Sequence, residues 1–492
     1  MKNLLLAAMF AGGVCAAVEA APTDTVTQAD LQALIQRINK LEAENKAQAA
    51  KIAELEGVAK KAAPAVVAAK TEAKAADETT EVSESGKIYT TDSGKKYFLA
   101  DATANIFEPL SESGLKITPY GYLVFEAVHN TRGTEVDIYT DYVRPKSSQG
   151  YRSHTTVFSM QDSILGLQFD TPERVAGWTF TGRAELDLAG DHANDYAFHW
   201  RHLYFNAEHE NGWSVLFGQT WHLWKMVAPS EIDGAWMENT GYPYRRSPQI
   251  RVTKKWDLDD SSSLEARFGL VKNGPGMGSD RDYDGSQDNS SSAWPLFEAA
   301  FIYDHDAAWE DKGSGKRWLF GVGGQYGRDR SYRFVDLGND EYAYGDAEDY
   351  NSQMVMLAGS VPFGDFTLCG QIFAGENLGR VQAGVGQGVG FSDWDKRGKE
   401  VATVGGFIDL NYKLNEKWSF AIGYGFDDPR IKRGYTEGTE KITYNDRAYI
   451  DAFYQLMDNF KLGLEYGRLS TKYLDDGTAY DDRIQFSAFY DF

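Results

Sequence analysis

The sequence predicts an all-β fold: a transmembrane antiparallel β-barrel of about sixteen strands, preceded by an N-terminal coiled-coil helix. Three observations lead to this prediction. The end of the chain, from Arg483, alternates between apolar and polar side chains, comparable segments recur from Leu115 onward, and the connections between these segments alternate between short and long.

The final segment, 483–492, has two distinct faces, because neighbouring side chains of a strand point to opposite sides. One face is apolar to the end of the chain and contains Ile484, Phe486, Ala488, Tyr490 and Phe492, while the other carries Arg483, Gln485, Ser487 and Asp491 beside Phe489. In an outer-membrane barrel the apolar face lies toward lipid and the polar face toward the lumen. The alternative is an edge strand of a soluble sandwich. The terminal aromatic residue resembles the ending of barrel proteins from the outer membrane of Gram-negative bacteria.

The lengths of the connections favour the barrel over the sandwich. Short connections are expected at 210–211, 362–363, 415–416 and 458–459, and long ones near 129–154, 227–247, 274–292, 329–349, 377–400 and 429–445. Bacterial outer-membrane barrels have short periplasmic turns and long outer loops, and an even number of strands. A barrel of this size keeps a water-filled lumen.

The first residues have the pattern of a signal peptide. Lys2 supplies the positive charge, residues 4–11 are apolar, and Val18-Glu19-Ala20 has small residues at the cleavage positions, which predicts a signal peptide over 1–20. Its removal leaves Cys369 as the only cysteine, so no intramolecular disulfide is expected. The formal net charge of -22 argues against nucleic acid as a partner.

A coiled-coil helix is predicted over 28–57, with Thr27 as its N-cap. Apolar residues recur alternately three and four positions apart, as in the seam of a coiled coil, and Asn45 and Gln48 are polar seam positions of the kind that fix register and oligomer number. The alternative is a lone amphipathic helix lying on another surface. The seam consists of Leu31, Leu34, Ile38, Leu41, Asn45, Gln48, Ile52 and Leu55.

Residues 58–114 are interpreted as a linker and lead-in, and 115–492 as the barrel. The segment 58–88 is rich in Ala, Lys, Glu and Thr and has too few large apolar side chains to fold alone. The clearest barrel strand is 178–188, in which Trp178, Phe180 and Leu186 alternate with polar residues such as Arg183 and Glu185.

The sequence contains no recognisable catalytic motif. It lacks Gly-x-Ser-x-Gly, a complete P-loop and His-Glu-x-x-His, so an enzyme is not expected. The prediction from the residues is a passive diffusion channel for small hydrophilic solutes, surrounded by outer-membrane lipid. The alternative is a structural anchor, in which the helix at 28–57 tethers the barrel to the cell wall and its peptidoglycan.

Several segments resemble the DcaP-like trimeric porins of the outer membrane. These are Arg201-His202-Leu203-Tyr204, Gly218-Gln219-Thr220-Trp221, Ser247-Pro248-Gln249-Ile250-Arg251, Gly375-Glu376-Asn377-Leu378-Gly379-Arg380 and Gly463-Leu464-Glu465-Tyr466-Gly467, with Leu203 and Ser247 departing from the family pattern. The resemblance implies a sixteen-stranded homotrimer, a periplasmic coiled coil, and uptake of small organic solutes that are often anionic, such as dicarboxylates.

The pore constriction is predicted in the third outer loop, 227–247, because sixteen-stranded porins resemble one another in folding that loop into the lumen. Opposite charges across a narrow channel create a transverse field that sets ion preference. The alternative is a set of ordinary surface charges. The predicted constriction residues are Glu231, Asp233, Glu238, Arg245 and Arg246, and the predicted pore-wall residues are Arg183, Glu185, Asp187, Arg251 and Arg267. Arg201 is left out, because it alternates in step with Leu203 and Phe205.

A calcium site is predicted in one acidic loop. Asp280, Asp282, Asp284 and Asp288 supply oxygen atoms at the first, third, fifth and ninth positions of a calcium loop, with Gly285 at the turn. Ser291 stands where the bidentate Glu would be, so the alternative is a solvated acidic loop. No other cofactor is expected.

Overall fold

The computed structural model describes residues 88–90, 96–98, 115–139, 141–171, 175–190, 196–273, 294–306, 317–338, 341–392, 398–436 and 439–492. The predicted signal peptide (1–20), coiled-coil helix (28–57) and calcium residues (Asp280, Asp282, Asp284 and Asp288) lie outside these ranges, and so does most of the predicted linker. Those four predictions remain predictions.

The chain divides into two units, Met1–Ala100 and Asp101–Phe492. Within the first unit, the described residues form a short antiparallel hairpin of β1 (Ile88–Thr90) and β2 (Lys96–Phe98). Among the described residues, no helix is long and apolar enough to cross a membrane.

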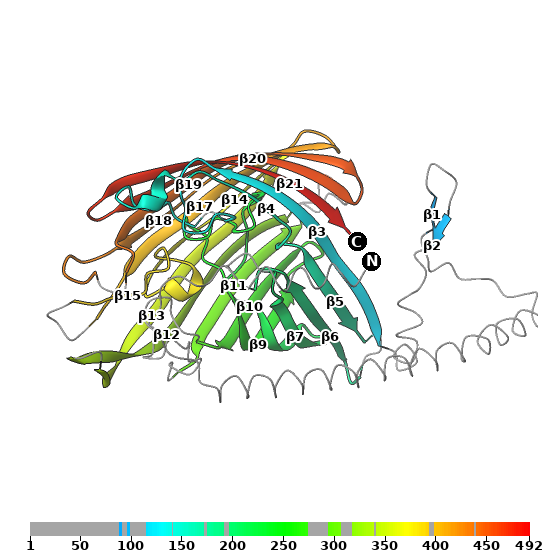
Figure 1. Cartoon of the computed structure of the whole chain (residues 1–492). Coiled ribbons are helices and arrows are strands. Elements are labelled where there is room, and N and C mark those ends of the chain that lie inside the picture. Colours follow the sequence, from blue (N-terminus) through cyan, green and yellow to red (C-terminus); the bar gives the residue numbers. More distant parts are fainter. Residues whose placement is uncertain are drawn as a thin grey trace, which may run out of the picture. The chain divides into compact units, whose positions relative to one another are not determined.

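The second unit contains a closed antiparallel barrel (Figure 1). Its strands are β3 (Lys116–Asn130), β4 (Thr155–Ser159), β5 (Ile164–Asp170), β6 (Trp178–Asp187), β7 (His199–His209), β8 (Trp213–Trp221), β9 (Arg246–Asp257), β10 (Ser262–Val271), β11 (Leu296–Asp306), β12 (Arg317–Gly338), β13 (Glu341–Phe363), β14 (Phe366–Glu376), β17 (Ala402–Lys413), β18 (Trp418–Arg430), β19 (Ile442–Met457), β20 (Phe460–Tyr473) and β21 (Gly477–Asp491). The outer loops add two short 3-10 helices, η1 (Gln149–Arg152) and η2 (Gly379–Val381), and the small pair β15 (Val389–Gly390) and β16 (Lys399–Glu400).

The barrel has sixteen strand positions, as the sequence predicts. Both β4 and β5 pair with β3, the first with Glu126–Asn130 and the second with Lys116–Tyr122, so together they make one interrupted strand. The last strand closes the barrel by pairing with the first, from Arg483↔Asn130 to Asp491↔Tyr122. Phe492 continues this pairing, because its backbone N–H donates to the Gly121 carbonyl at 3.1 Å.

The alternation in β21 separates the two surfaces of the barrel wall. Ile484 and Phe486 are 52% and 38% exposed on the outer surface, whereas Arg483 and Gln485 are almost fully buried inside. The same division recurs around the barrel: Leu464, Ile450 and Ile422 are exposed, and Glu465, Asp451 and Ala421 are buried. The outer surface is therefore apolar and the inner surface polar, which is the arrangement of a transmembrane barrel.

The order of short and long connections agrees with the prediction, with one correction. Residues 329–349 were expected to form a long loop, but the cross-strand pairs of β12 and β13 continue outward to Gly338↔Glu341. The segment is rich in charged residues, yet it also carries regularly spaced Tyr, Phe and Val, which favour strands. Its backbone groups are consequently satisfied in a hairpin ladder.

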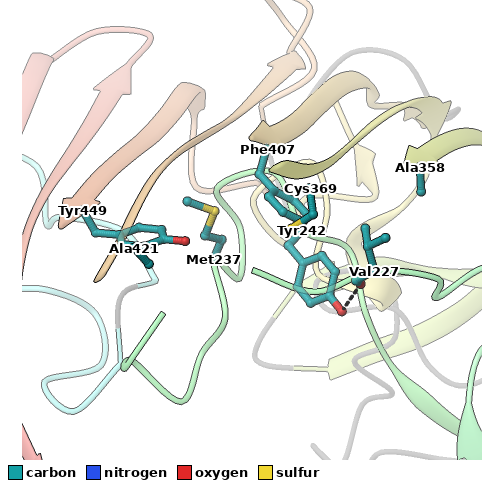
Figure 2. Close-up of a cluster of buried hydrophobic side chains, with 8 residues drawn as sticks. All are labelled: Val227, Met237, Tyr242, Ala358, Cys369, Phe407, Ala421 and Tyr449. Carbon is teal, nitrogen blue, oxygen red and sulfur yellow. Dashed lines mark hydrogen bonds between the residues drawn. The ribbon is translucent and has the colours of Figure 1, made fainter. Parts of the chain in front are cut away.

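The connection 222–245 between β8 and β9, called loop 3 below, folds into the barrel. Figure 2 shows its side chains Val227, Met237 and Tyr242 within one buried apolar cluster, whose other members come from β13, β14, β17, β18 and β19. The Tyr242 ring packs edge-on against Phe407, with ring centroids 5.4 Å apart, and its hydroxyl donates to the Val227 carbonyl at 2.9 Å. The main apolar core of this barrel thus lies between loop 3 and the wall.

Gly241 allows the backbone of loop 3 to touch the wall. Its φ of +116° lies in a region that favours glycine, and a Cβ at this position would lie 2.1 Å from the Gly406 carbonyl oxygen. The carbonyl of Gly241 also accepts a hydrogen bond from Gln371 of β14. The backbone of loop 3 is therefore in direct contact with the barrel wall at Gly241.

We expect Gly241→Ala to detach part of loop 3, at a cost of about 1–3 kcal/mol, because the new methyl group overlaps the wall. Thermal unfolding in detergent and proteolysis of loop 3 measure the effect. Gly477→Ala is the matched control, since Gly477 also has a positive φ but its Cβ would meet no atom within 4 Å. Equal unfolding temperatures for the two variants would refute the close approach.

Candidate functional site in the barrel lumen

A buried cluster of charges fixes the middle of loop 3 to the wall. Nη1 of Arg447, on β19, lies 2.9 Å from an Asp233 oxygen and 3.2 Å from a Glu231 oxygen, and its Nη2 pairs with Glu465 of β20. Arg483 of β21 lies 3.5 Å from the same Asp233 oxygen. These five residues are called the loop anchor below.

Backbone groups strengthen the loop anchor. The N–H groups of Ile232 and Asp233 both donate to the second Glu465 oxygen, at 3.1 and 3.2 Å. Charge-assisted hydrogen bonds of this kind are stronger than neutral ones. The anchor therefore fixes the chain direction of loop 3 as well as its side chains.

The structure places Glu231 and Asp233 in the loop anchor, with no exposed side-chain surface. Burial raises the pKa of Glu231 well above its usual range, and Arg447 offsets this only in part. Both residues thus lie inside the barrel, where they contact the wall instead of lining a solvated constriction. Glu231 also borders a cavity described below.

Glu238 and Arg245 serve the packing of loop 3. The Tyr244 hydroxyl donates to Glu238 at 2.8 Å, and burial raises the pKa of Glu238 to about 8. Arg245 donates to the Arg380 carbonyl at 2.6 Å, which links loop 3 to the outer connection between β14 and β17. Neither contact crosses an open passage.

Arg246 belongs to a second group, in which cations stack on aromatic rings. The Lys225 Nζ lies 3.8 Å from the centre of the Trp221 ring and 4.9 Å from that of Trp236, and the Arg246 guanidinium lies 4.5 Å from the Trp221 ring. Tyr244 packs against both tryptophans, with centroid distances of 5.8 and 6.0 Å. These five residues are called the cation–aromatic cluster below.

Lys225 carries the least compensated charge of this cluster. No ion pair between Lys225 and a carboxylate is present in the part of the chain that the structure describes. Burial, followed by repulsion from Arg246 and Arg201, lowers the pKa of Lys225 to about 7. Its charge therefore changes near neutral pH. The sequence analysis missed Lys225 because it began the loop at residue 227.

Arg201 was excluded by its alternation, and this exclusion was wrong. The pairing of β6 with β7 slips between Glu185↔His202 and Leu186↔Trp200, so Arg201 is the extra residue of a β-bulge. Its guanidinium donates to Glu185 and Asp187 at 2.8 and 2.9 Å, on the inner surface. A bulge rotates a side chain out of strict alternation, and no local sequence signal marks this one.

The five predicted wall residues point into the barrel. Glu185 and Asp187 hold Arg201, while Arg183 lies over the Tyr120 ring at 5.1 Å. Arg251 donates to the Trp221 carbonyl at 2.5 Å, and Arg267 donates to the Leu223 carbonyl at 3.2 Å and pairs with Glu265. Arg251 and Arg267 therefore support the start of loop 3.

Of three cavities beside loop 3, one adjoins the two others. The largest, about 790 Å³, extends toward the short turns and is lined by polar residues of several strands. It shares Ser230, Phe453 and Lys461 with a cavity of about 230 Å³. It shares Met226, Asp304, Arg317 and Leu319 with a third, of about 220 Å³, which Lys225 also lines. Loop 3 thus leaves cavities in the lumen that charged side chains line.

Removing the central cation of the loop anchor should destabilise the barrel. Arg447→Met leaves Glu231, Asp233 and Glu465 buried without their main cation, a change that costs about 3–5 kcal/mol. Urea unfolding in detergent micelles measures it. The control is Arg468→Met, which breaks the half-exposed Arg468–Asp482 pair and should change stability by less than about 1 kcal/mol. Similar losses in both variants would show that the anchor is dispensable.

The fold is similar to that of known outer-membrane proteins. The outer-membrane channel DcaP of Acinetobacter baumannii superposes with a TM-score of 0.60 and 19% identity, over 77% of this chain and 98% of that chain. OprB of Pseudomonas putida gives 0.48 and 9% over 79% and 97%, and the anion-selective porin of Comamonas acidovorans gives 0.47 and 12% over 77% and 100%. Neither a protein-family model nor a curated protein matches the chain.

Three of the five motifs that resemble the DcaP-like porins meet beside the cation–aromatic cluster. The His202 ring bonds to the Thr220 hydroxyl at 2.9 Å and packs edge-on against Trp221, which joins two of the motifs, and Arg251 of a third donates to Trp221. The resemblance is confirmed at the level of the fold: the described chain has the fold of a porin-like outer-membrane channel.

Proposed function

We propose that this protein is an outer-membrane porin of a Gram-negative bacterium, a passive channel for small hydrophilic solutes that performs no covalent chemistry. The observation that carries the proposal is the incompletely filled lumen. Loop 3 is anchored inside the barrel, yet it leaves adjoining polar cavities of about 790, 230 and 220 Å³. A barrel that served only as an anchor would have no need for such space.

The proposal includes a preference for solutes that carry a negative charge. Lys225, Arg246 and Arg201 lie near one another, and Lys225 has no carboxylate pair among the described residues. The Arg guanidinium matches the geometry of a carboxylate, and the Lys225 ammonium adds a second positive charge beside it, so these cations are suited to organic anions such as dicarboxylates. We assign the constriction to Lys225 and Arg246, with Arg201, Arg183, Glu185 and Asp187 on the adjoining wall. Glu231, Asp233, Glu238 and Arg245 position loop 3.

The partners follow from the same proposal. The exposed apolar outer surface, which includes Ile422, Ile450 and Leu464, is suited to lipid. A homotrimer is proposed from the family resemblance and the heptad at 31–55, which would lie in the periplasm. Contact of this segment with peptidoglycan belongs to the second candidate function, a cell-wall tether.

Conductance separates the porin from the tether. Purified protein added to a planar lipid bilayer in KCl should produce stepwise current increases. The reversal potential across a KCl gradient should show anion preference, and Arg246→Ala should reduce that preference because one lumen cation is lost. A bilayer that stays silent with folded protein would favour the tether.

The anion preference should depend on pH near neutrality. Lys225 is protonated below its pKa of about 7 and neutral above it, so the anion-to-cation permeability ratio should be higher at pH 6 than at pH 8. Lys225→Met should remove this dependence, and Lys225→Arg should keep the high ratio at both values. Lys472→Met, on the exposed side of β20, is the charge-matched control. A ratio that does not change with pH in the wild type would remove Lys225 from the constriction.

A further inference from the structure

A groove of about 800 Å³ lies on the outer surface of the barrel, across the strands β9 to β13, which are neighbours in the wall (Figure 1). Its lining is mostly apolar, and its aromatic rings are exposed. On the inner side of the same strands, Leu223 and Trp224 of loop 3 fill the space beside Gly269 and Gly323. The groove therefore opens toward the membrane and not toward the lumen. The lining residues used below are Leu270, Phe297, Ala299, Phe301, Gly324 and Tyr326.

Two small residues form the floor of the groove. Ala299 of β11 and Gly324 of β12 are directly opposite each other, and Phe297 and Tyr326 form the next pair on the same face toward the outer loops. Phe301 lies on this face toward the periplasmic turns, because side chains two positions apart share one side of a sheet. An unbranched apolar chain laid over the two small residues would therefore contact the backbone beneath it and the rings at its sides.

The groove lies at the depth of the hydrocarbon layer. On β12, the exposed side chains of Trp318 and Arg328 bound a segment whose outward residues carry no charge. This segment has the length of a transmembrane strand, about 9–11 residues. Tryptophan is enriched at membrane interfaces, so Trp318 marks the periplasmic interface and Arg328 the outer one. The uncharged outward residues are Phe320, Val322, Gly324 and Tyr326.

Two cations lie at the outer end of the groove. The pairs Leu270↔Phe297 and Phe297↔Tyr326 form one row of the outer face. Lys272 and Arg328 each lie two positions beyond this row toward the outer loops, and both are exposed. Since adjacent strands are about 4.8 Å apart, the backbones of the two cations are about 10 Å apart, so both long side chains can reach one anion.

The described residues leave the charge of Arg328 uncompensated. No ion pair between Arg328 and a carboxylate occurs among the residues that the structure describes. Glu376, on the same face two strands away, accepts a hydrogen bond from Gln353 at 2.9 Å. The guanidinium group of Arg328 is therefore suited to an anionic group from outside the protein.

We propose that the groove binds one phosphate-bearing lipid of the outer leaflet. An acyl chain lies over Ala299 and Gly324, and the phosphate lies between Lys272 and Arg328. Arginine matches the geometry of a phosphate, and lysine adds a point charge. Basic residues beside the hydrocarbon layer bind lipid head groups in other membrane proteins. The inference rests on the proposed outer-membrane location and goes beyond it, because it assigns a specific lipid site to one part of the wall.

A second copy of this chain is the alternative occupant. Its apolar outer surface would cover the rings of the groove, but apolar contact provides no negative charge for Arg328. A lipid provides the chain and the anion in one molecule, and its flexible chain adapts to the shape of the groove. The lipid is therefore favoured both by the apolar lining and by the positive charge at the outer end.

The test measures lipid bound to the full-length protein. Protein in a neutral detergent is incubated with diphosphoryl lipid A, or with the same lipid A after enzymatic removal of its phosphates, and native mass spectrometry quantifies the bound lipid. Diphosphoryl lipid A should bind about tenfold more tightly, because its phosphates add charge-assisted contacts. Inorganic phosphate at the same concentration should not displace it, since free phosphate lacks the acyl chain.

Two variants address the two parts of the site. Lys272→Gln combined with Arg328→Gln should weaken the binding of diphosphoryl lipid A about tenfold. Ala299→Phe should also weaken it, because the ring fills the floor of the groove without a change of charge. The controls are Arg468→Gln, at an exposed arginine already held in an ion pair, and Ala448→Phe, at an exposed alanine of β19. Both controls should bind the lipid like the wild type.

The outcomes separate the lipid site from the channel. Equal binding of the two forms of lipid A by the wild type, or normal binding by either site variant, would overturn the lipid site. Conductance in KCl, recorded in bilayers of synthetic phosphatidylcholine, should be unchanged in all variants, so such a lipid result leaves the porin intact. Selective lipid A binding by folded protein that is silent in the bilayer would support the site and overturn the porin. A smaller oligomer for Ala299→Phe in light scattering, with lipid binding unchanged, would assign the groove to a second copy.

Discussion

The hydrogen-bonded pairing of the last strand with the first closes the barrel and makes its membrane-spanning form possible. A strand in lipid cannot leave its N–H and C=O groups unpaired, so a sheet can cross a membrane only when it has no edges. Here β21 and β3 satisfy each other from Arg483↔Asn130 to Asp491↔Tyr122, and Phe492 adds a further backbone bond to Gly121. Closure separates a polar inner surface from an apolar outer surface, and loop 3 and its charged contacts lie on the inner side.

Inside the barrel, loop 3 takes the place of a hydrophobic core. Its apolar side chains pack on Phe407 and neighbouring residues, while the loop anchor ties its acidic residues to Arg447 and Arg483. Arg447 has no exposed side-chain surface, so its pairs are formed away from water, where the loss of one partner leaves another charge uncompensated. These contacts fix the conformation of loop 3 inside the lumen and thereby define the cavities beside it.

The charges of the lumen are divided between two regions that use different wall strands. The cation–aromatic cluster joins loop 3 to β8 and β9, and β7 adds Arg201 nearby, whereas the buried carboxylates Glu126 and Glu231 lie toward β3 and β19. Trp236 contacts Lys225 and also lines the cavity with Glu126 and Glu231, so it lies between the two regions. Fixed charges in a narrow, partly desolvated space are weakly screened, so this division of charge creates a field across the lumen.

Features that depend on neighbouring residues could be predicted from the sequence. Alternation in segments such as 178–188 and 483–492 indicated the barrel, its sidedness and the inward direction of Arg183, Arg251 and Arg267, because the period of a strand is a local property. The number of alternating segments after Leu115 indicated about sixteen strands, the alternation of connection lengths favoured a barrel over a sandwich, and the motifs indicated the porin fold. Extended hairpins were missed where charge suggested a loop, as at 329–349.

Which charges meet depends on the closed barrel and could not be predicted from the sequence. The partners of Glu231 and of the Ile232 N–H lie more than two hundred positions away, on β19 and β20, and sequence spacing says nothing about such contacts. The bulge that turns Arg201 inward depends on the register between β6 and β7. Lys225 stacks on Trp221 because loop 3 begins directly after β8. The loop charges that looked alike in the sequence are therefore divided among an anchor, packing contacts and a lumen cation, because burial and pairing are set by the closed barrel around them.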